Sequence, residues 1–472
     1  MRSTYKLLIA SLSLLTLACD VIHQQPQDRI AEVNFWKTAD DAQSAIIGVY
    51  DRVQGLAAQD PLAFDVGSDA LVALVDNDGY IQFDQKKVTV DNTLADAYWA
   101  NNYSGIHRVN DIISRVPALN DPAFLPGQKE GIVGEAHFLR AHFYFNLVRA
   151  YGPVPLITVP YDSFNADFTV ERTPTEQVYA QIIADLTAAE TALPASYTDA
   201  FQTRGRATSG AAKALLARVY LRTGAFQNAA DKAAEVIANP LYALVTGPAA
   251  YAALFTPSGK NGTEAIFEVQ YLGSTGEGHG LHSRFMPVAN AGQLGGNYWL
   301  APSPEIVSAY GPGDIRKNAA IGVSTNPPFR NIGDVYVKKY IRLSDGSDPN
   351  LIAIRLADVI LMRAEALNRT GKTAEATQLL NTIRRRAYNV PLTTASVYDF
   401  PSASDQTKGF DLTLALENER FLELAFEGQR WHDLVRTGRA SAVLKISANQ
   451  TLWPIPQRER DRNPRLAQNT GY

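Results

Sequence analysis

The chain reads Arg206-Ala-Thr-Ser-Gly-Ala-Ala-Lys-Ala-Leu-Leu-Ala-Arg-Val-Tyr-Leu-Arg-Thr-Gly224 and then Ala225-Phe-Gln-Asn-Ala-Ala-Asp-Lys-Ala-Ala-Glu-Val-Ile237, and this stretch decides its fold. Small residues such as Ala211 alternate with large ones such as Leu215 at helical spacing, so a second helix can pack closely against the first. Thr223-Gly224 supplies the turn between them. The stretch therefore predicts a hairpin of two helices.

The same pattern recurs later in the chain. A helical run begins at Ile354 and ends at Thr370-Gly371, and a second run follows from Lys372 to Arg385. Helix, Thr-Gly turn and helix is typical of tetratricopeptide-type hairpins, which build binding surfaces rather than catalytic centres. The Gly-Lys-Thr string at this turn is not a nucleotide-binding loop, because Ala366 stands where that loop requires glycine.

Most of the remaining chain is also predicted to be helical. Apolar residues recur at helical spacing in the segments 36–56, 92–116, 129–150, 174–192 and 411–437. Between 239 and 350 the composition changes to Gly, Pro, Asn, Ser and aromatics, interrupted only by short strand-like runs such as 265–270 and 334–338. A smaller loop-rich stretch covers 60–91, and long loops in compact proteins are usually functional. We therefore predict a mostly all-α fold, in which a scaffold of helical hairpins carries a loop-rich, irregular ligand-binding face.

The only cysteine, Cys19, lies at the end of a short apolar run near the N-terminus. That run has basic residues before it and is too short to span a bilayer. A small residue followed by cysteine is the cleavage pattern of bacterial lipoproteins, so we predict a signal peptide at 1–18 and a lipid on Cys19. Thr16 and Leu17 depart from the usual pattern, and an ordinary secreted protein is the alternative.

Composition narrows the classes of function. Without residues 1–18 the chain has 42 basic and 48 acidic residues, a net charge of −6, which argues against nucleic acid as a partner. No cysteine remains after position 19, which excludes disulfides within the chain and thiol catalysis. We expect 19–472 to form a single unit with parts at about 19–238, 239–350 and 351–472.

Charged residues crowd the segment 417–436, and so many carboxylates could suggest glycoside hydrolysis. Glu427 precedes Arg430 by three residues, and Asp433 precedes Arg436 by the same distance. Helices use this spacing for internal ion pairs. We therefore predict a structural role for the segment and no enzyme. Two carboxylates about 5 to 10 Å apart in one cleft would instead support the alternative that the protein is a hydrolase.

Exposed aromatic residues next to amides are the best candidates for ligand binding. The apolar face of a pyranose ring packs on an indole or phenol, while amides and carboxylates take its hydroxyls. The candidates are Trp299, Tyr298 and Asn297 in the long middle region, and Trp99, Asn101, Asn102, Tyr80 and Asp78 in or after the smaller loop-rich stretch. Trp99 and Tyr103 stand four apart on a predicted helix, so a place in the core is the alternative for them.

The histidines give no metal site. His137 and His142 lie five residues apart and so do not share a helical face as a zinc pair would. His279 and His282 lie with Glu277 in a glycine-rich loop, where they could contact a ligand or a metal. We assign no metal and no cofactor.

Several segments together resemble one family. They are 35–50, 134–156, 206–237, 417–436, and 453–457 with 468–472. In this order, behind a lipoprotein signal, they look like the SusD/RagB family of outer-membrane nutrient-binding lipoproteins of the Bacteroidetes. The resemblance covers nearly the whole mature chain.

The resemblance implies a mostly helical fold with four tetratricopeptide-like hairpins and an irregular ligand face. Family members sit at the cell surface as the lid of a SusC-type TonB-dependent transporter, capture oligosaccharides and are not enzymes. We therefore expect a surface-exposed protein, anchored to the outer membrane by lipid, that binds a glycan and delivers it to such a transporter. A peptide-binding member of the family and a helical-repeat adaptor without a small ligand are the alternatives.

Overall fold

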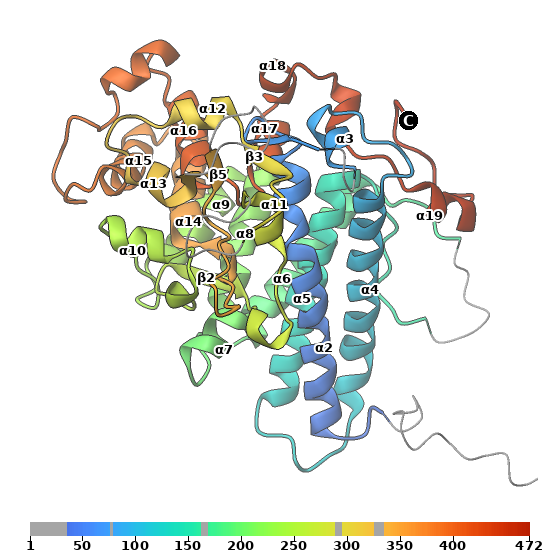
Figure 1. Cartoon of the computed structure of the whole chain (residues 1–472). Helices are drawn as coiled ribbons and strands as arrows, with labels where there is room; N and C mark the ends of the chain where they lie inside the picture. The colour runs from blue at the N-terminus through green and yellow to red at the C-terminus, as the bar shows by residue number, and fades with distance from the viewer. Residues whose placement is uncertain (1–34, 76–78, 162–168, 288–294, 325–334) are drawn as a thin grey trace, which may run out of the picture.

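Long helices packed side by side make up most of the molecule (Figure 1). The computed structural model describes residues 35–75, 79–161, 169–287, 295–324 and 335–472. The longer helices are α2 (Ala39–Ala57), α4 (Thr93–Arg115), α5 (Gln128–Tyr151), α6 (Thr175–Ala192), α8 (Ser209–Thr223), α9 (Phe226–Ile237), α14 (Leu356–Arg369), α15 (Thr373–Ala387) and α16 (Leu412–Glu423). The prediction of a mostly α-helical fold is confirmed.

Shorter elements connect the long helices. The short helices are α3 (Tyr80–Asp84), α7 (Ala200–Gly205), α10 (Pro248–Ala253), α11 (Leu281–Phe285), α12 (Pro304–Ala309), α13 (Ile315–Ala320), α17 (Arg430–Arg436), α18 (Ala440–Leu444) and α19 (Gln457–Arg462). The strands are β1 (Leu71–Ala73), β2 (Ala265–Val269), β3 (Leu300–Pro302), β4 (Ile321–Val323), β5 (Val335–Val337) and β6 (Leu351–Arg355). They form three separate antiparallel pairs, β1 with β3, β2 with β6 and β4 with β5.

Both predicted Thr-Gly hairpins are present. Gly224 ends α8 with a φ of 78°, and Gly371 stands between α14 and α15 with a φ of 81°, a backbone conformation that favours glycine. α14 also packs against α9, so the second hairpin continues the stack begun by the first. One boundary differs from prediction: the second hairpin begins at Leu356, because the β-branched residues before it pair with β2 as strand β6.

Close packing between α4 and α5 depends on Gly105. A Cβ atom there would stand 2.4 Å from the ring of Phe143, whereas one at Gly131 on α5 would meet nothing within 4 Å. We expect Gly105→Ala to lower the free energy of unfolding by about 1–3 kcal/mol, because the ring would have to move. Gly131→Ala should raise it by about 0.5–1 kcal/mol, since a helix favours alanine. Urea denaturation of both variants checks the pair, and equal midpoints would contradict the packing.

The charged segment 417–436 has a structural role, with one correction. Asp433 and Arg436 form the predicted pair at 2.7 Å, but Glu427 pairs with Arg355 and Lys339 rather than with Arg430. The prediction for Glu427 is wrong because α16 ends at Glu423 and the chain turns before α17 begins. Phe426 and Gly428 in that turn have φ values of 67° and 72°.

Buried arginines join the loop-rich middle to the same segment. Arg316, Arg355 and Arg386 all donate to the fully buried carboxylate of Glu423. Arg386 and Arg355 also bind Glu264, which precedes β2. This Glu423 network therefore fixes segments that lie more than 100 residues apart in the sequence.

Candidate functional site

Pairing of β1 with β3 brings the two loop-rich regions of the sequence together. Leu71 lies opposite Pro302, and Ala73 lies opposite Leu300. Just beyond this pair, the backbone N–H of Leu74 donates to the carbonyl oxygen of Trp299 at 2.7 Å. The residues around Tyr80 and Trp299 thus meet on one face, although more than 200 positions separate them in the chain.

Three side chains form what we call the aromatic platform: Tyr80, Arg284 and Trp299. The ring centroids of Tyr80 and Trp299 are 6.4 Å apart, and the Arg284 guanidinium lies 4.5 Å from the centroid of the indole. Arg284 Nε also donates to the Tyr80 hydroxyl oxygen at 3.3 Å. Trp299 is partly exposed whereas Tyr80 is buried, so the indole is the ring most open to a ligand.

Tyr298 packs beneath the surface next to Trp299 and supports the platform. Its side chain is buried, and its hydroxyl donates to the carbonyl oxygen of Val335 at 2.7 Å, which ties β5 to the platform. Its φ of 49° is unusual for a residue with a side chain, and it turns Tyr298 inward. Met286, Ala301 and Tyr336 pack with it in a small separate hydrophobic cluster. Tyr298 is thus buried beneath the platform, and contact of its side chain with a ligand stays a prediction.

Hydrogen bonds to helix α11 hold the backbone of the platform residues in place. The N–H of Trp299 donates to Arg284 O at 2.9 Å, and the N–H of Asn297 donates to Ser283 O at 2.7 Å. Asn297 is exposed beside Trp299, in reach of a ligand on the indole. Sequence reasoning missed Arg284, whose only signal was its position directly after the glycine-rich loop.

Trp99 and its neighbours lie elsewhere, on α4. The Trp99 side chain is 3% exposed and packs edge to face on Tyr151, with the ring of Tyr103 5.0 Å away. Asn102 is completely buried and donates to Tyr98 O at 2.7 Å. Asn102 therefore lies in the core, whereas Trp99 is buried but also borders the surface hollow along α4. Contact of either residue with a ligand stays a prediction.

Two further candidates gain no support as ligand contacts. Asn101 is half-buried on the same helix, α4, and its role stays a prediction. Asp78 falls outside the described residues.

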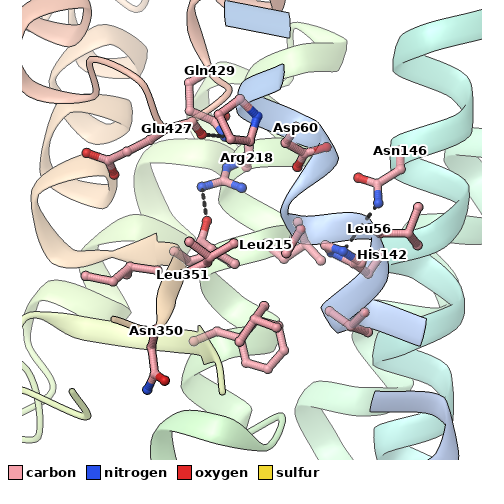
Figure 2. A pocket seen from close by; sticks show the side chains of 18 of the residues that line it. Leu56, Asp60, His142, Asn146, Leu215, Arg218, Asn350, Leu351, Glu427 and Gln429 are labelled. Carbon is pink, nitrogen blue, oxygen red and sulfur yellow. Dashed lines mark hydrogen bonds between the residues drawn. The ribbon is translucent and has the colours of Figure 1, made fainter. Parts of the chain in front are cut away.

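An interior cavity of about 60 Å³ is lined by side chains of α2, α5, α8 and β6 (Figure 2). Asp60, His142 and Arg218 point toward it, and burial lowers the pKa of His142 to about 3. Ligand pockets for small molecules are typically about 300–1,000 Å³, so this cavity is too small for a sugar. Its polar lining suits ordered water.

Two larger hollows open on the surface. One, of about 850 Å³, runs along α4 past Tyr103 and His107 to the C-terminal segment. The other, of about 750 Å³, lies between α2, α7 and the glycine-rich loop. Neither includes Trp299. Stacking needs an exposed ring face rather than an enclosed volume, so the platform remains the better candidate for a sugar.

The described parts of the chain lack two further features. They contain no group of three or more His, Cys, Asp or Glu residues placed to hold a metal ion. They also contain no helix that is long and apolar enough to cross a membrane.

Comparisons with known proteins point to one family. A family model described as starch-binding associating with outer membrane matches residues 24–221, and the model of the SusD family matches 319–450. SusD-like protein P38 of Formosa agariphila is 27% identical over 515 residues, covering 99% of this chain and 98% of that protein. A SusD-like protein of Bacteroides ovatus is 25% identical and covers 91% and 81%.

Solved structures agree. A laminarin-binding SusD-like protein superimposes with a TM-score of 0.79 at 29% identity, covering 92% of this chain and all of that one. Surface glycan-binding protein A of Bacteroides thetaiotaomicron, solved with laminarihexaose, gives a TM-score of 0.77 over 92% of this chain and all of that one. Its 21% identity shows a shared fold alone.

Proposed function

The chain belongs to the SusD family, and from that premise we propose that it binds a glycan on the aromatic platform. The observation that carries the proposal is the partly exposed indole of Trp299, held beside Tyr80 and Arg284 by residues from two distant loops. The laminarin-binding relative supports a glycan rather than a peptide.

The platform would bind a sugar through both stacking and hydrogen bonds. The indole offers an apolar surface to the C–H face of a sugar ring, and Asn297 and Arg284 offer donors to its hydroxyls. Such contacts are few, and ordering a flexible sugar chain offsets part of their free energy. We therefore expect modest affinity that depends only weakly on salt.

We also propose that the protein is not an enzyme. The carboxylates of the charged segment are engaged: Glu423 binds three arginines, Glu427 binds Arg355, and Asp433 binds Arg420 and Arg436. Glu427 borders the interior cavity, which is too small for a sugar. A pair of carboxylates available for hydrolysis is therefore not formed by these residues.

A screen of the purified chain lacking residues 1–18, against glycan and peptide libraries that include laminarin, tests the proposal. Retention of one or more glycans is the expected result. Retention of peptides alone would favour a peptide-binding protein, and hydrolysis of any retained polysaccharide would overturn the non-enzyme assignment. Binding to a transporter with no small ligand would favour an adaptor.

For its cellular place, we propose a lipid on Cys19, exposure on the outer membrane and delivery of glycan to a SusC-type transporter. The outer-membrane association of the matched family supports this. In Cys19→Ala the acylated thiol is absent, so we expect most of the protein to leave the membrane fraction. Cell fractionation with immunoblotting measures the shift. Unchanged retention would mean that a protein partner, rather than lipid, holds it.

A further inference from the structure

Behind the platform lies a buried group that we call the Asp348 cluster: Asp348, His279 and Arg342. The side chains of His279 and Asp348 are 0% and 1% exposed. Neither oxygen of the Asp348 carboxylate, nor Nε2 of His279, has a hydrogen-bond partner among the residues that the structure describes. An unsatisfied buried carboxylate is costly, so this cluster needs an explanation.

The polar atoms around Asp348 are close to one another but not in direct hydrogen bonds. His279 Nε2 is 3.9 Å from Asp348 Oδ1, and Arg342 Nε is 3.9 Å from Asp348 Oδ2. Both distances are too long for a direct hydrogen bond. A water about 2.8 Å from both His279 and Asp348 would bridge the first gap.

The protonation of His279 fits such a bridge. The backbone N–H of Leu281 donates to His279 Nδ1 at 3.1 Å, so the proton of a neutral ring lies on Nε2. Burial, with His282, Arg342 and Lys260 nearby, lowers the pKa of His279 to about 3 and keeps the ring neutral. Nε2–H is then a donor that a water can accept, and that water can donate to Asp348.

A metal ion fits the same place poorly. His279 Nε2 carries a proton and so cannot ligate a cation without losing the Leu281 hydrogen bond. The guanidinium of Arg342 already serves as the cation, donating to Gly273 O at 2.8 Å and Gly346 O at 3.0 Å. An uncharged molecule that both donates and accepts hydrogen bonds fits this place better.

The cluster is connected to the platform through α11. The backbone N–H of Arg342 donates to His282 Nδ1 on this helix at 3.0 Å. One and two residues further along α11, Ser283 O and Arg284 O accept from the backbone N–H groups of Asn297 and Trp299. Gly273 and Gly278 let the loop approach closely, since a Cβ on them would lie 2.3 and 2.5 Å from Asp348 Oδ2.

We propose that the Asp348 cluster holds one buried water between His279 and Asp348, and that this bridge positions α11 so that Arg284 and Trp299 meet the ligand. His279 and Asp348 are positioning residues, since they act through α11 and do not touch the glycan. The role in binding rests on the proposed function, whereas the water and its effect on α11 do not.

Hydrogen exchange of the ligand-free chain tests the link between the cluster and α11. His279→Leu removes the Nε2–H donor, so we expect exchange of the amides of 282–285 to become about tenfold faster. The Leu281 amide is left out of the comparison, because its own acceptor is His279 Nδ1. His279→Gln places an N–H donor near the same point and should restore slow exchange. Asp345→Asn is the matched control, because Asp345 lies in the same loop but is exposed. Equal exchange in His279→Leu and His279→Gln would overturn the proposal.

A crystal structure of the native chain tests the water directly. We expect solvent density within about 3.2 Å of both His279 Nε2 and Asp348 Oδ1. A direct contact between the two side chains, or a metal ion there, would overturn the proposal even if no His279 variant folds.

Titration with laminarin then separates this inference from the proposed function. We expect His279→Leu to weaken binding about tenfold and Asp345→Asn to leave it unchanged. Native affinity in His279→Leu would overturn the positioning role, whereas no laminarin binding by the native chain would count against the glycan and leave the exchange result standing.

Discussion

Glu423→Leu is expected to lower the free energy of unfolding by at least about 3–5 kcal/mol, because it leaves three buried guanidinium groups without their shared carboxylate. Arg316, Arg355 and Arg386 all donate to Glu423, and each of the four side chains is at most 1% exposed. Leucine has a similar volume but accepts no hydrogen bond. The chain carrying it should be largely unfolded at room temperature or unfold at a much lower urea concentration than the native chain.

Glu459→Gln is the matched control for this loss. Glu459 pairs with Arg462 at 3.1 Å on the surface, and the Arg462 side chain is 60% exposed. Solvent screens such pairs, so the variant should change the free energy of unfolding by less than about 1 kcal/mol. Similar urea midpoints for Glu423→Leu and Glu459→Gln would contradict the view that the Glu423 network holds the fold.

Acid unfolding checks the same network without a variant. Burial alone would raise the pKa of Glu423, but the guanidinium groups of Arg386, Arg355 and Arg316 outweigh it and hold the pKa well below its ordinary value. Arg420 and Arg436 likewise overcome burial and hold the pKa of Asp433 at about 2. A lowered pKa contributes stability above the unfolded value and loses it as pH falls. Melting temperature should therefore drop between about pH 4 and pH 2.

Local signals in the sequence were sufficient to predict the helical scaffold. The hairpins around Gly224 and Gly371 depend on contacts between residues close in the chain, where apolar spacing and a turn residue determine the outcome. Glu427 shows the limit of such reasoning. Its spacing to Arg430 suits a helix, but a turn at Gly428 intervenes and distant Arg355 becomes its partner.

The candidate site was only partly predictable for the same reason. Trp299 and Tyr80 were each singled out by composition, yet nothing local shows that β1 and β3 pair and bring them together. Trp99 has the same local features as Trp299, an aromatic beside amides. Its burial follows from the packing of α4 on α5, which sequence spacing alone left as one of two alternatives.

Trp299→Ala is expected to weaken glycan binding by at least about tenfold, and to abolish it in assays of modest sensitivity. The indole is the most open ring of the platform, so its loss removes both the stacking contact and the apolar area that a sugar would cover. Together these contributions exceed about 1.4 kcal/mol, which corresponds to a tenfold change in affinity. Isothermal titration with the glycan retained in the screen, or affinity electrophoresis in gels containing it, measures the loss.

Trp36→Ala provides the control that makes this loss specific. Trp36 is also partly exposed and also lies near an arginine, Arg115, but it precedes α2 and has no contact with the platform residues. The two variants remove the same side chain from similar surroundings, so a general effect on folding would appear in both. Loss in Trp299→Ala alone supports the platform. Native affinity in Trp299→Ala, with the fold intact by circular dichroism, would mean that the glycan binds another surface. The hollow along α4 beside Tyr103 is then the next candidate, because it combines aromatic rings with a volume of about 850 Å³.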